Sequence, residues 1–312
     1  MKFKDQVILC CSIILALSIA IWYQLQGPTQ QKIKPYVVCT TTIIADIVKN
    51  IGQDSIETIT LMGPGIDPHL YKPVESDIIK ITSADIIFYN GLHLEAKMAD
   101  IFEQLAITQT TVAVTKNIPQ SMLLQIGQYD QMFDPHVWFD INLWMYAVNA
   151  ICQTLVENFP HHKNLYENNT KKYIEQLEQL LIQTQEIMHK IPQEQRILIT
   201  GHDAFSYFGR VYNCKVIGLQ GISTESSPGI YDIQKIIKLI CDYNIPAIFI
   251  ESSIPIKNIL AVQEGVAAQY KKIDLGGELY SDALGPQNSS GSTYIDMILH
   301  NVTTIAQALK AI

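Results

Sequence analysis

The stretch Tyr36-Val-Val-Cys-Thr-Thr-Thr-Ile-Ile-Ala-Asp-Ile-Val-Lys-Asn-Ile51 decides the fold class of this chain. Its first part, residues 36–42, is a short β-branched run that predicts a strand, and residues 43–51 carry apolar side chains at helical spacing. The same alternation continues through the first half of the chain. Further strands are expected at 57–61, 85–89 and 111–114, and helices at 74–82, 95–105 and 141–159. This pattern indicates a parallel sheet covered by helices.

The second half repeats the pattern after one long helical segment. Residues 161–191 are polar with apolar positions at near-helical intervals, and Pro192 marks the end of the helix. Beyond it, strands are expected at 196–200, 215–219, 247–250 and 272–275, and helices at 230–243, 255–269 and 293–311. The chain is therefore predicted to be α/β, with two lobes that each contain a mostly parallel sheet and with one long rigid helix as the bridge. The predicted limits are 1–34 for an N-terminal segment, 35–160 for the first lobe, 161–192 for the linker helix and 193–312 for the second lobe.

Composition and the N-terminus limit the class of protein. The 312 residues include 22 Lys and Arg against 30 Asp and Glu, so the formal charge of −8 makes a strongly basic nucleic-acid binder implausible. Lys2 and Lys4 precede the apolar run 7–23, a layout typical of an export signal. The small residues of Ser18-Ile-Ala20 favour cleavage, but the run is also long enough to remain as a membrane anchor. Cys10 and Cys11 follow bulky residues, which argues against a lipid anchor.

The cysteines of the exported part give no metal or disulfide pattern. They are widely separated and contain no CxxC spacing, so we expect them to be small buried apolar residues: Cys39, Cys152, Cys214 and Cys241.

Three histidines and one aspartate stand where polar ligands gather. Asp67-Pro-His69 and Asp134-Pro-His136 place imidazoles on proline-stiffened loops at sheet edges, and His202 directly follows a buried strand. Asp282 lies just beyond another predicted strand, in a glycine-flanked loop. Three neutral imidazoles and a carboxylate suit a divalent first-row metal, and two of them would come from each lobe. Spacing alone leaves the alternatives open, because loop histidines often only form hydrogen bonds and Asp-Pro often opens a turn.

Several motifs in the same order resemble a known family. Gly65-Ile-Asp-Pro-His-Leu-Tyr-Lys-Pro73, Asp134-Pro-His-Val-Trp-Phe-Asp140, Thr200-Gly-His-Asp-Ala-Phe-Ser-Tyr-Phe208, Ile248-Phe-Ile-Glu-Ser-Ser253 and Gly277-Glu-Leu-Tyr-Ser-Asp-Ala-Leu284 are similar to segments of the zinc/manganese substrate-binding proteins of bacterial ABC importers, a group that includes the zinc-uptake complex component A family. The resemblance implies metal held between two lobes by residues matching His69, His136, His202 and Asp282. It also implies delivery of the metal to a membrane permease from a periplasmic or membrane-anchored site outside the cytoplasm.

Departures from the family pattern bear on the metal. Zinc-importing relatives often carry a long His-rich loop before the second ligand, and residues 121–133 here are short and contain no His. Manganese-preferring relatives often have Glu where this chain has His202, and three nitrogens with carboxylate oxygen suit Zn²⁺. Zinc is therefore favoured, with manganese or ferrous iron as alternatives. Because metal ligands must lose their protons, affinity is expected to fall as the pH drops through about 6.5.

Other residues receive supporting or structural interpretations. Asp67 and Asp134 are expected to orient the neighbouring imidazoles, and Glu251 is expected to support the site or the contact between lobes. His93 lies near a functional loop. The remaining histidines (161, 162, 189 and 300) are explained by solvation or the helix dipole, and Trp138, Trp144 and Tyr280 by packing.

Two other functions compete with metal carriage. A secreted zinc hydrolase would leave one coordination position for water and would use Glu251 or Glu278 as a base, but the chain contains no HExxH. A surface adhesin is the second alternative, although no adhesive motif is present. The sequence favours a monomeric carrier that is not an enzyme, and its stiff linker helix predicts a small displacement of the lobes on metal loading.

Overall fold

The computed structural model describes residues 34–127 and 132–309, and the residues from Pro35 onward form one unit. The predicted export segment and its possible cleavage site lie outside the described residues. Within the two described ranges, no helix is long and apolar enough to cross a membrane.

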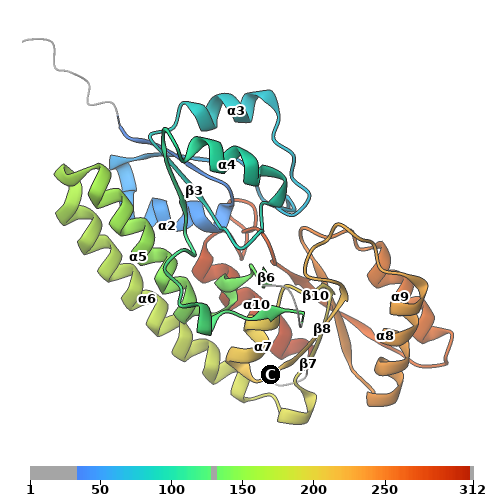
Figure 1. Cartoon of the computed structure of the whole chain (residues 1–312). Helices are drawn as coiled ribbons and strands as arrows, with labels where there is room; N and C mark the ends of the chain where they lie inside the picture. Colours follow the sequence, from blue (N-terminus) through green and yellow to red (C-terminus); the bar gives the residue numbers. More distant parts are fainter. Residues whose placement is uncertain (1–33, 128–131, 310–312) are drawn as a thin grey trace, which may run out of the picture. The chain divides into compact units, whose positions relative to one another are not determined.

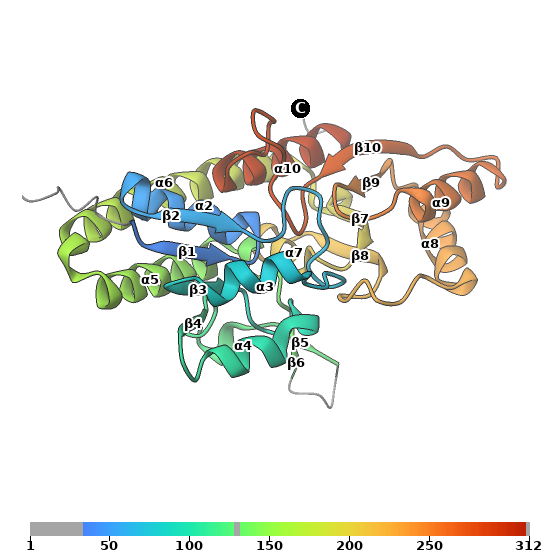
Figure 2. The same ribbon diagram turned by 90° about the horizontal axis from the view of Figure 1, so that it is seen from above.

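The first sheet is parallel throughout and has the order β2-β1-β3-β4. Thr41 caps the helix that follows the first strand, since its side chain accepts a hydrogen bond from the backbone N–H of Ile44. Because the four strands are parallel, their carboxyl ends all lie at one edge of the sheet, where the following loops gather. Figure 2 shows this sheet beside the helices that cover it. The elements are β1 (Tyr36–Cys39), α2 (Thr42–Gly52), β2 (Glu57–Thr60), α3 (Glu75–Thr82), β3 (Ile86–Tyr89), α4 (Ala99–Leu105) and β4 (Thr110–Ala113).

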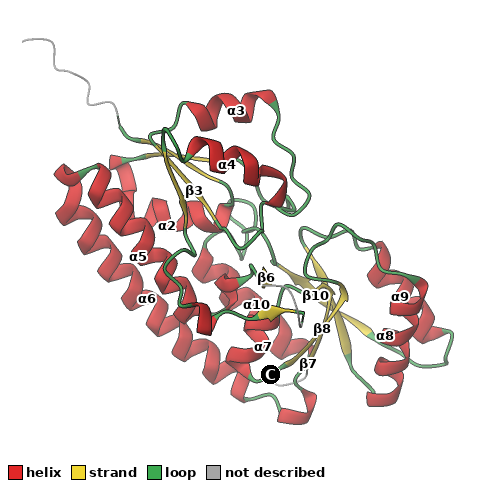
Figure 3. Cartoon of the chain, in the orientation of Figure 1, coloured by secondary structure: helices red, strands yellow, loops and turns green. Residues whose placement is uncertain are grey.

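The second half contains two parallel strand pairs, β7 with β8 and β9 with β10, and β7 lies against β9. Helices α8 and α9 pack against each other and against these strands, and they enclose a separate apolar cluster that includes Ile199, Ile248 and Val262 (Figure 3). The elements are β7 (Ile197–His202), α7 (Ser206–Tyr212), β8 (Lys215–Gln220), α8 (Ile230–Tyr243), β9 (Ala247–Glu251), α9 (Lys257–Ala267) and β10 (Asp274–Leu279).

A long helix connects the two halves. α6 (Lys163–His189) packs against α5 (Ile141–Asn158) and α2, and also against α10 (Tyr294–Ala308) of the C-terminal half (Figure 1). At 1.5 Å per residue its 27 residues extend about 40 Å. The largest apolar core includes residues of α2, α5, α6, α7 and α10, so it is shared by both halves. Such a shared core resists displacement of one half against the other.

The predicted α/β class is confirmed, with differences at several element ends. The long helix begins at Lys163, because Pro160–His162 form a separate 3₁₀ turn. The last strand was expected at 272–275 and instead extends to Leu279, with an irregular register near Gly277, whose φ of 121° is open to glycine. The sequence also failed to indicate α7 and the short hairpin of β5 (Gln125–Ile126) and β6 (Met132–Phe133). The four cysteines are free thiols; three are buried as expected, and Cys241 is half-buried.

Candidate metal centre

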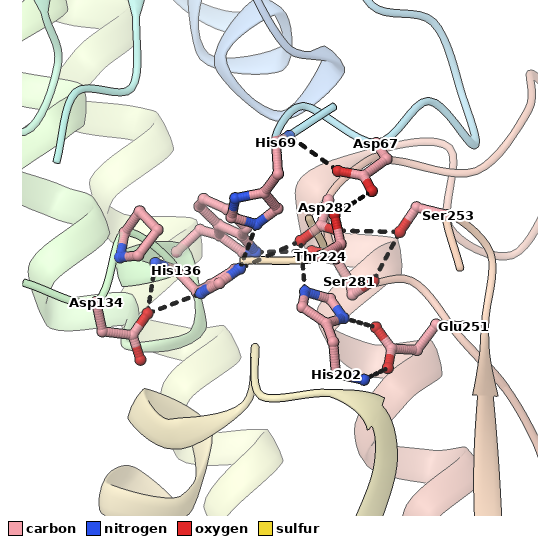
Figure 4. Close-up of polar contacts among 12 residues, drawn as sticks. Asp67, His69, Asp134, His136, His202, Thr224, Glu251, Ser253, Ser281 and Asp282 are labelled. Atoms are coloured by element: carbon pink, nitrogen blue, oxygen red, sulfur yellow. Dashed lines mark hydrogen bonds and ion pairs between the residues drawn. The ribbon is translucent and has the colours of Figure 1, made fainter. Parts of the chain in front are cut away.

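Four predicted ligands from separate parts of the chain meet at one buried point. His69, His136, His202 and Asp282 are all buried, and one potential ligand atom from each lies within 4.8 Å of the others. Figure 4 shows the three rings and the carboxylate pointing toward one another. His69 lies in the loop after β2, His136 follows β6, His202 ends β7, and Asp282 follows β10. The structure thus brings together every residue of the predicted set.

The inward atoms are the Nε2 atoms of the histidines and one oxygen of the aspartate. Nε2 of His69 and Nε2 of His136 are 3.2 Å apart. Oδ1 of Asp282 is 3.5 Å from Nε2 of His136 and 3.5 Å from Nε2 of His202. Three imidazole nitrogens and a carboxylate oxygen at these separations form a donor set that fits a small divalent metal ion.

Asp67 fixes the loop that carries His69. Its Oδ1 accepts a hydrogen bond of 2.8 Å from the backbone N–H of His69, and its Oδ2 accepts one of 2.5 Å from the hydroxyl of Thr224. Pro68, which lies between Asp67 and His69, restricts the backbone of this loop. The expected role of Asp67 therefore includes a contact with the C-terminal half of the chain.

Asp134 orients His136 from within the N-terminal half. Its Oδ1 accepts from the backbone N–H of His136 at 2.9 Å and lies 2.7 Å from the ring Nδ1. A proton held on Nδ1 leaves Nε2 free to face the other ligands. Tyr207, from α7, donates to the backbone carbonyl of Asp134 at 3.0 Å and so supports the same loop.

Glu251 orients His202 in the same way from the end of β9. Its Oε1 accepts from the backbone N–H of His202 at 2.8 Å, and its Oε2 lies 2.6 Å from the ring Nδ1. Asp282 is held by the hydroxyl of Ser253, which donates to Oδ2 at 3.0 Å and leaves Oδ1 turned toward the histidines. The rings of His136 and His202 and the carboxylate of Asp282 therefore each have a partner that fixes their direction, whereas His69 is held through its backbone.

The buried charges shift the pKa values of the four groups in different directions. Burial lowers the pKa of His69 to about 3. Burial would also lower the pKa of His136, but Asp134 and Asp282 outweigh it and raise that pKa to about 9. Glu251 and Asp282 likewise outweigh burial and raise the pKa of His202 well above its ordinary value. Burial opposes ionisation of Asp282, yet the neighbouring histidines hold its pKa well below the usual range.

These shifts describe a site arranged for a cation. In the metal-free protein, protons on His136 and His202 balance the surrounding carboxylates, while His69 is neutral. A divalent metal that displaces the two ring protons would supply similar charge at the same point.

Several residues around the site escaped the sequence interpretation. Trp138, assigned to packing, has its ring 5.2 Å from that of His136 and donates from Nε1 to the carbonyl of Ser281 at 2.9 Å. Thr224 carried no signal, and Ser253 entered only as the end of a family motif, because short hydroxyl side chains are common in loops. His300, assigned to solvation or the helix dipole, instead ties a loop to β10: its Nδ1 lies 2.8 Å from the hydroxyl of Ser290 and its Nε2 lies 2.9 Å from the carbonyl of Glu278.

His93 is outside the group of four. It is exposed, has a φ of 64°, and lines a cavity of about 370 Å³ that His69 also lines.

Comparisons with known proteins identify the family of this chain. The model of the family described as "Zinc-uptake complex component A periplasmic" matches residues 37–308. The chain is 44% identical to the zinc-binding protein TroA of Treponema pallidum, covering 88% of this chain and 89% of TroA. It is 43% identical to the manganese-binding lipoprotein MntA of Bacillus subtilis, again covering 88% of this chain and 89% of the relative. The iron-binding protein YfeA of Yersinia pestis is 34% identical over 90% of this chain and 88% of YfeA.

A solved structure shows the same fold. The periplasmic zinc-binding protein TroA from Treponema pallidum superposes with a TM-score of 0.86 at 44% identity, covering 88% of this chain and 99% of TroA. A family match over nearly all described residues, together with relatives well above 30% identity, establishes the family. This chain therefore belongs to the zinc-uptake complex component A family of metal-binding transport proteins.

Proposed function

We propose that the protein is the substrate-binding component of an ABC importer for a divalent transition metal. His69, His136, His202 and Asp282 hold the ion between the two halves of the chain, and the loaded protein presents it to a membrane permease. The observation that carries the proposal is the group of four buried ligand atoms within 4.8 Å of one another, contributed by four separate loops and strand ends. A closed set of four protein ligands suits carriage of an ion.

Zinc is the favoured cargo, with manganese or ferrous iron as alternatives. Three imidazoles and a single carboxylate form a nitrogen-rich site, and Mn²⁺ prefers more oxygen. Overall similarity does not decide the metal, since relatives named for zinc and for manganese are 44% and 43% identical to this chain. Supply of the metal and selection by the permease would then contribute to the choice in the cell.

The family relationship supports a site of action outside the cytoplasm and a permease as partner. We propose export by the N-terminal segment, with the mature protein either periplasmic or anchored to the outer face of the membrane. We also propose that it works as a monomer, divided into lobes at residues 35–160 and 193–312 with 161–192 as the linker.

The hydrolase alternative loses one of its two candidate bases. Both oxygens of Glu251 contact His202, one at the backbone N–H and one at Nδ1, so this carboxylate acts as a positioning group. We propose that the protein is a carrier and not an enzyme, and we assign no catalytic residue.

Metal analysis of the purified protein tests the proposal. Protein purified without added metal and then reconstituted separately with Zn²⁺, Mn²⁺ and Fe²⁺ should hold one ion per chain by mass spectrometry. His69→Ala and His202→Ala should lose that ion, while His161→Ala, which changes an exposed histidine, should keep it. Failure to retain any of the three metals would overturn the carrier function and favour the adhesin alternative. Retention by both site variants would overturn the ligand set.

A further inference from the structure

The three histidines of the site are held in two different ways. The rings of His136 and His202 each face a carboxylate from their own half of the chain, at 2.7 and 2.6 Å. The orienting contact shown for His69 is made to its backbone, through Asp67. The position of His69 therefore depends on whatever holds Asp67.

Asp67 is held from the opposite half of the chain. The hydroxyl of Thr224, in the loop after β8, donates to Oδ2 of Asp67 at 2.5 Å (Figure 4). Thr224 is 7% exposed and is the one buried residue among residues 221–230. A hydrogen bond from Gln220 Nε2 to the carbonyl of Ser226, 3.1 Å long, shapes the loop around it. An otherwise exposed loop thus buries a single hydroxyl against the group that positions a ligand.

A second contact joins the loop of Thr224 to a different segment of the N-terminal half. Glu225, the next residue, forms an ion pair with Lys97, and both side chains of that pair are exposed to solvent. Surface ion pairs contribute little free energy, whereas a hydrogen bond from a buried hydroxyl to a carboxylate contributes more. The hydroxyl of Thr224 is therefore the stronger of the two contacts.

We propose that Thr224 is a positioning residue that slows metal release. Its hydroxyl connects the C-terminal half to Asp67, and Asp67 holds the backbone of His69 in place against the ion. When the loops at the site move apart, the hydrogen bond between Thr224 and Asp67 breaks, His69 loses its support, and His69 becomes the first ligand to leave. His136 and His202 remain oriented, because their carboxylate partners move with them. This inference rests on the proposed function and assigns a role that the ligand set alone does not contain.

Release kinetics of zinc test the proposal. Purified protein loaded with Zn²⁺ is mixed in a stopped-flow instrument with an excess of a chromophoric chelator, and the dissociation rate constant is measured for wild type, Thr224→Val and Thr224→Ser. Val keeps the shape of Thr without its hydroxyl, and Ser keeps the hydroxyl. Loss of one such hydrogen bond predicts release about 3- to 10-fold faster in T224V. T224S should release zinc at the wild-type rate.

Two further measurements distinguish a positioning role of Thr224 from a general disruption of the metal site. The association rate constant of T224V should stay within about twofold of wild type, because the free ligands still meet, whereas a disordered site would slow association as well. Glu225→Gln, which removes the neighbouring ion pair, should leave release within about twofold of wild type.

The outcomes distinguish this inference from the function on which it rests. Wild-type release rates in T224V, or equally fast release in T224S and T224V, would refute the role of the hydroxyl while leaving the carrier function intact. Absence of zinc binding by the wild-type protein itself would overturn both.

Discussion

Glu251→Gln should weaken zinc binding far more than an isosteric change usually does. One carboxylate oxygen accepts a hydrogen bond of 2.8 Å from the backbone N–H of His202, and the other lies 2.6 Å from the ring Nδ1 as an ion pair. Glutamine offers one carbonyl oxygen and one NH₂ group, so it cannot accept from both. If the NH₂ faces Nδ1, the ring proton moves to Nε2, the atom that faces Asp282 and the metal.

The structure also sets the expected magnitude. A hydrogen bond to a charged group contributes about 1.5–3 kcal/mol, and about 1.4 kcal/mol corresponds to a tenfold change in affinity. Loss of one such bond in E251Q therefore predicts zinc affinity about 10- to 100-fold weaker, the range typical of groups that orient metal ligands. Competition with a fluorescent zinc chelator at fixed pH and ionic strength measures this difference directly.

Asp134→Asn provides a matched comparison on the other histidine. Both contacts of Asp134 with His136 go to the same oxygen, Oδ1, at 2.9 and 2.7 Å. An asparagine carbonyl can accept both, so D134N loses charge but keeps the geometry, and its affinity should fall by less than about tenfold. Glu264→Gln changes an exposed glutamate of α9 and should have no effect. Zinc affinity of E251Q within about twofold of wild type would refute the inference that Glu251 supports zinc binding by keeping the ring proton of His202 on Nδ1. An equal loss of affinity in D134N and E251Q would refute it as well.

Two further predictions concern protons and the support of the Asp282 loop. Since the pKa of metal-free His136 is raised to about 9 and that of His202 is raised well above its ordinary value, zinc must displace both protons at pH 7.5, and affinity should decline from about pH 9 downward. Calorimetry in buffers of different ionisation enthalpy should show release of about two protons per zinc; release near zero would contradict the charges assigned to these rings. Trp138→Phe leaves the carbonyl of Ser281 without its donor. Trp144→Phe is the control, because the indole N–H of Trp144 has no hydrogen-bond partner in the described ranges. Trp138→Phe should lower the free energy of unfolding of the metal-free protein by about 1–3 kcal/mol more than Trp144→Phe. Equal urea denaturation midpoints for the two variants would argue against that contribution.

The charges at the site also change the expected effect of pH. The sequence predicts a decline of affinity near pH 6.5, the ordinary value for imidazole. In the structure the pKa values of the three histidines shift in different directions. Burial lowers the pKa of His69, while neighbouring carboxylates raise the pKa values of His136 and His202. The identity of those neighbours depends on contacts such as that between His202 and Glu251, which are 49 residues apart.

The sequence by itself determined the α/β class, the long helix and the four candidate ligands. Strand and helix periodicity is local, so most elements lie within a few residues of their predicted limits. The candidate ligands could be proposed because Asp-Pro-His motifs and the ends of strands are visible in a single chain, and their order resembles that of a known family.

The sequence suggested Asp67, Asp134 and Glu251 as supporting groups, and only the tertiary structure decided which atoms hold the candidate ligands. No local pattern relates the residues that these contacts join. Examples are the contact between Asp67 and Thr224, the contact between Trp138 and Ser281, and the packing of α6 in the shared core. A hydroxyl or an indole nitrogen has no periodicity that marks its partner, and its hydrogen bond depends on a separation of about 3 Å set by the packing of whole elements. For this reason the chemistry of the site could be read from the sequence, while the strength and kinetics of binding depend on the fold.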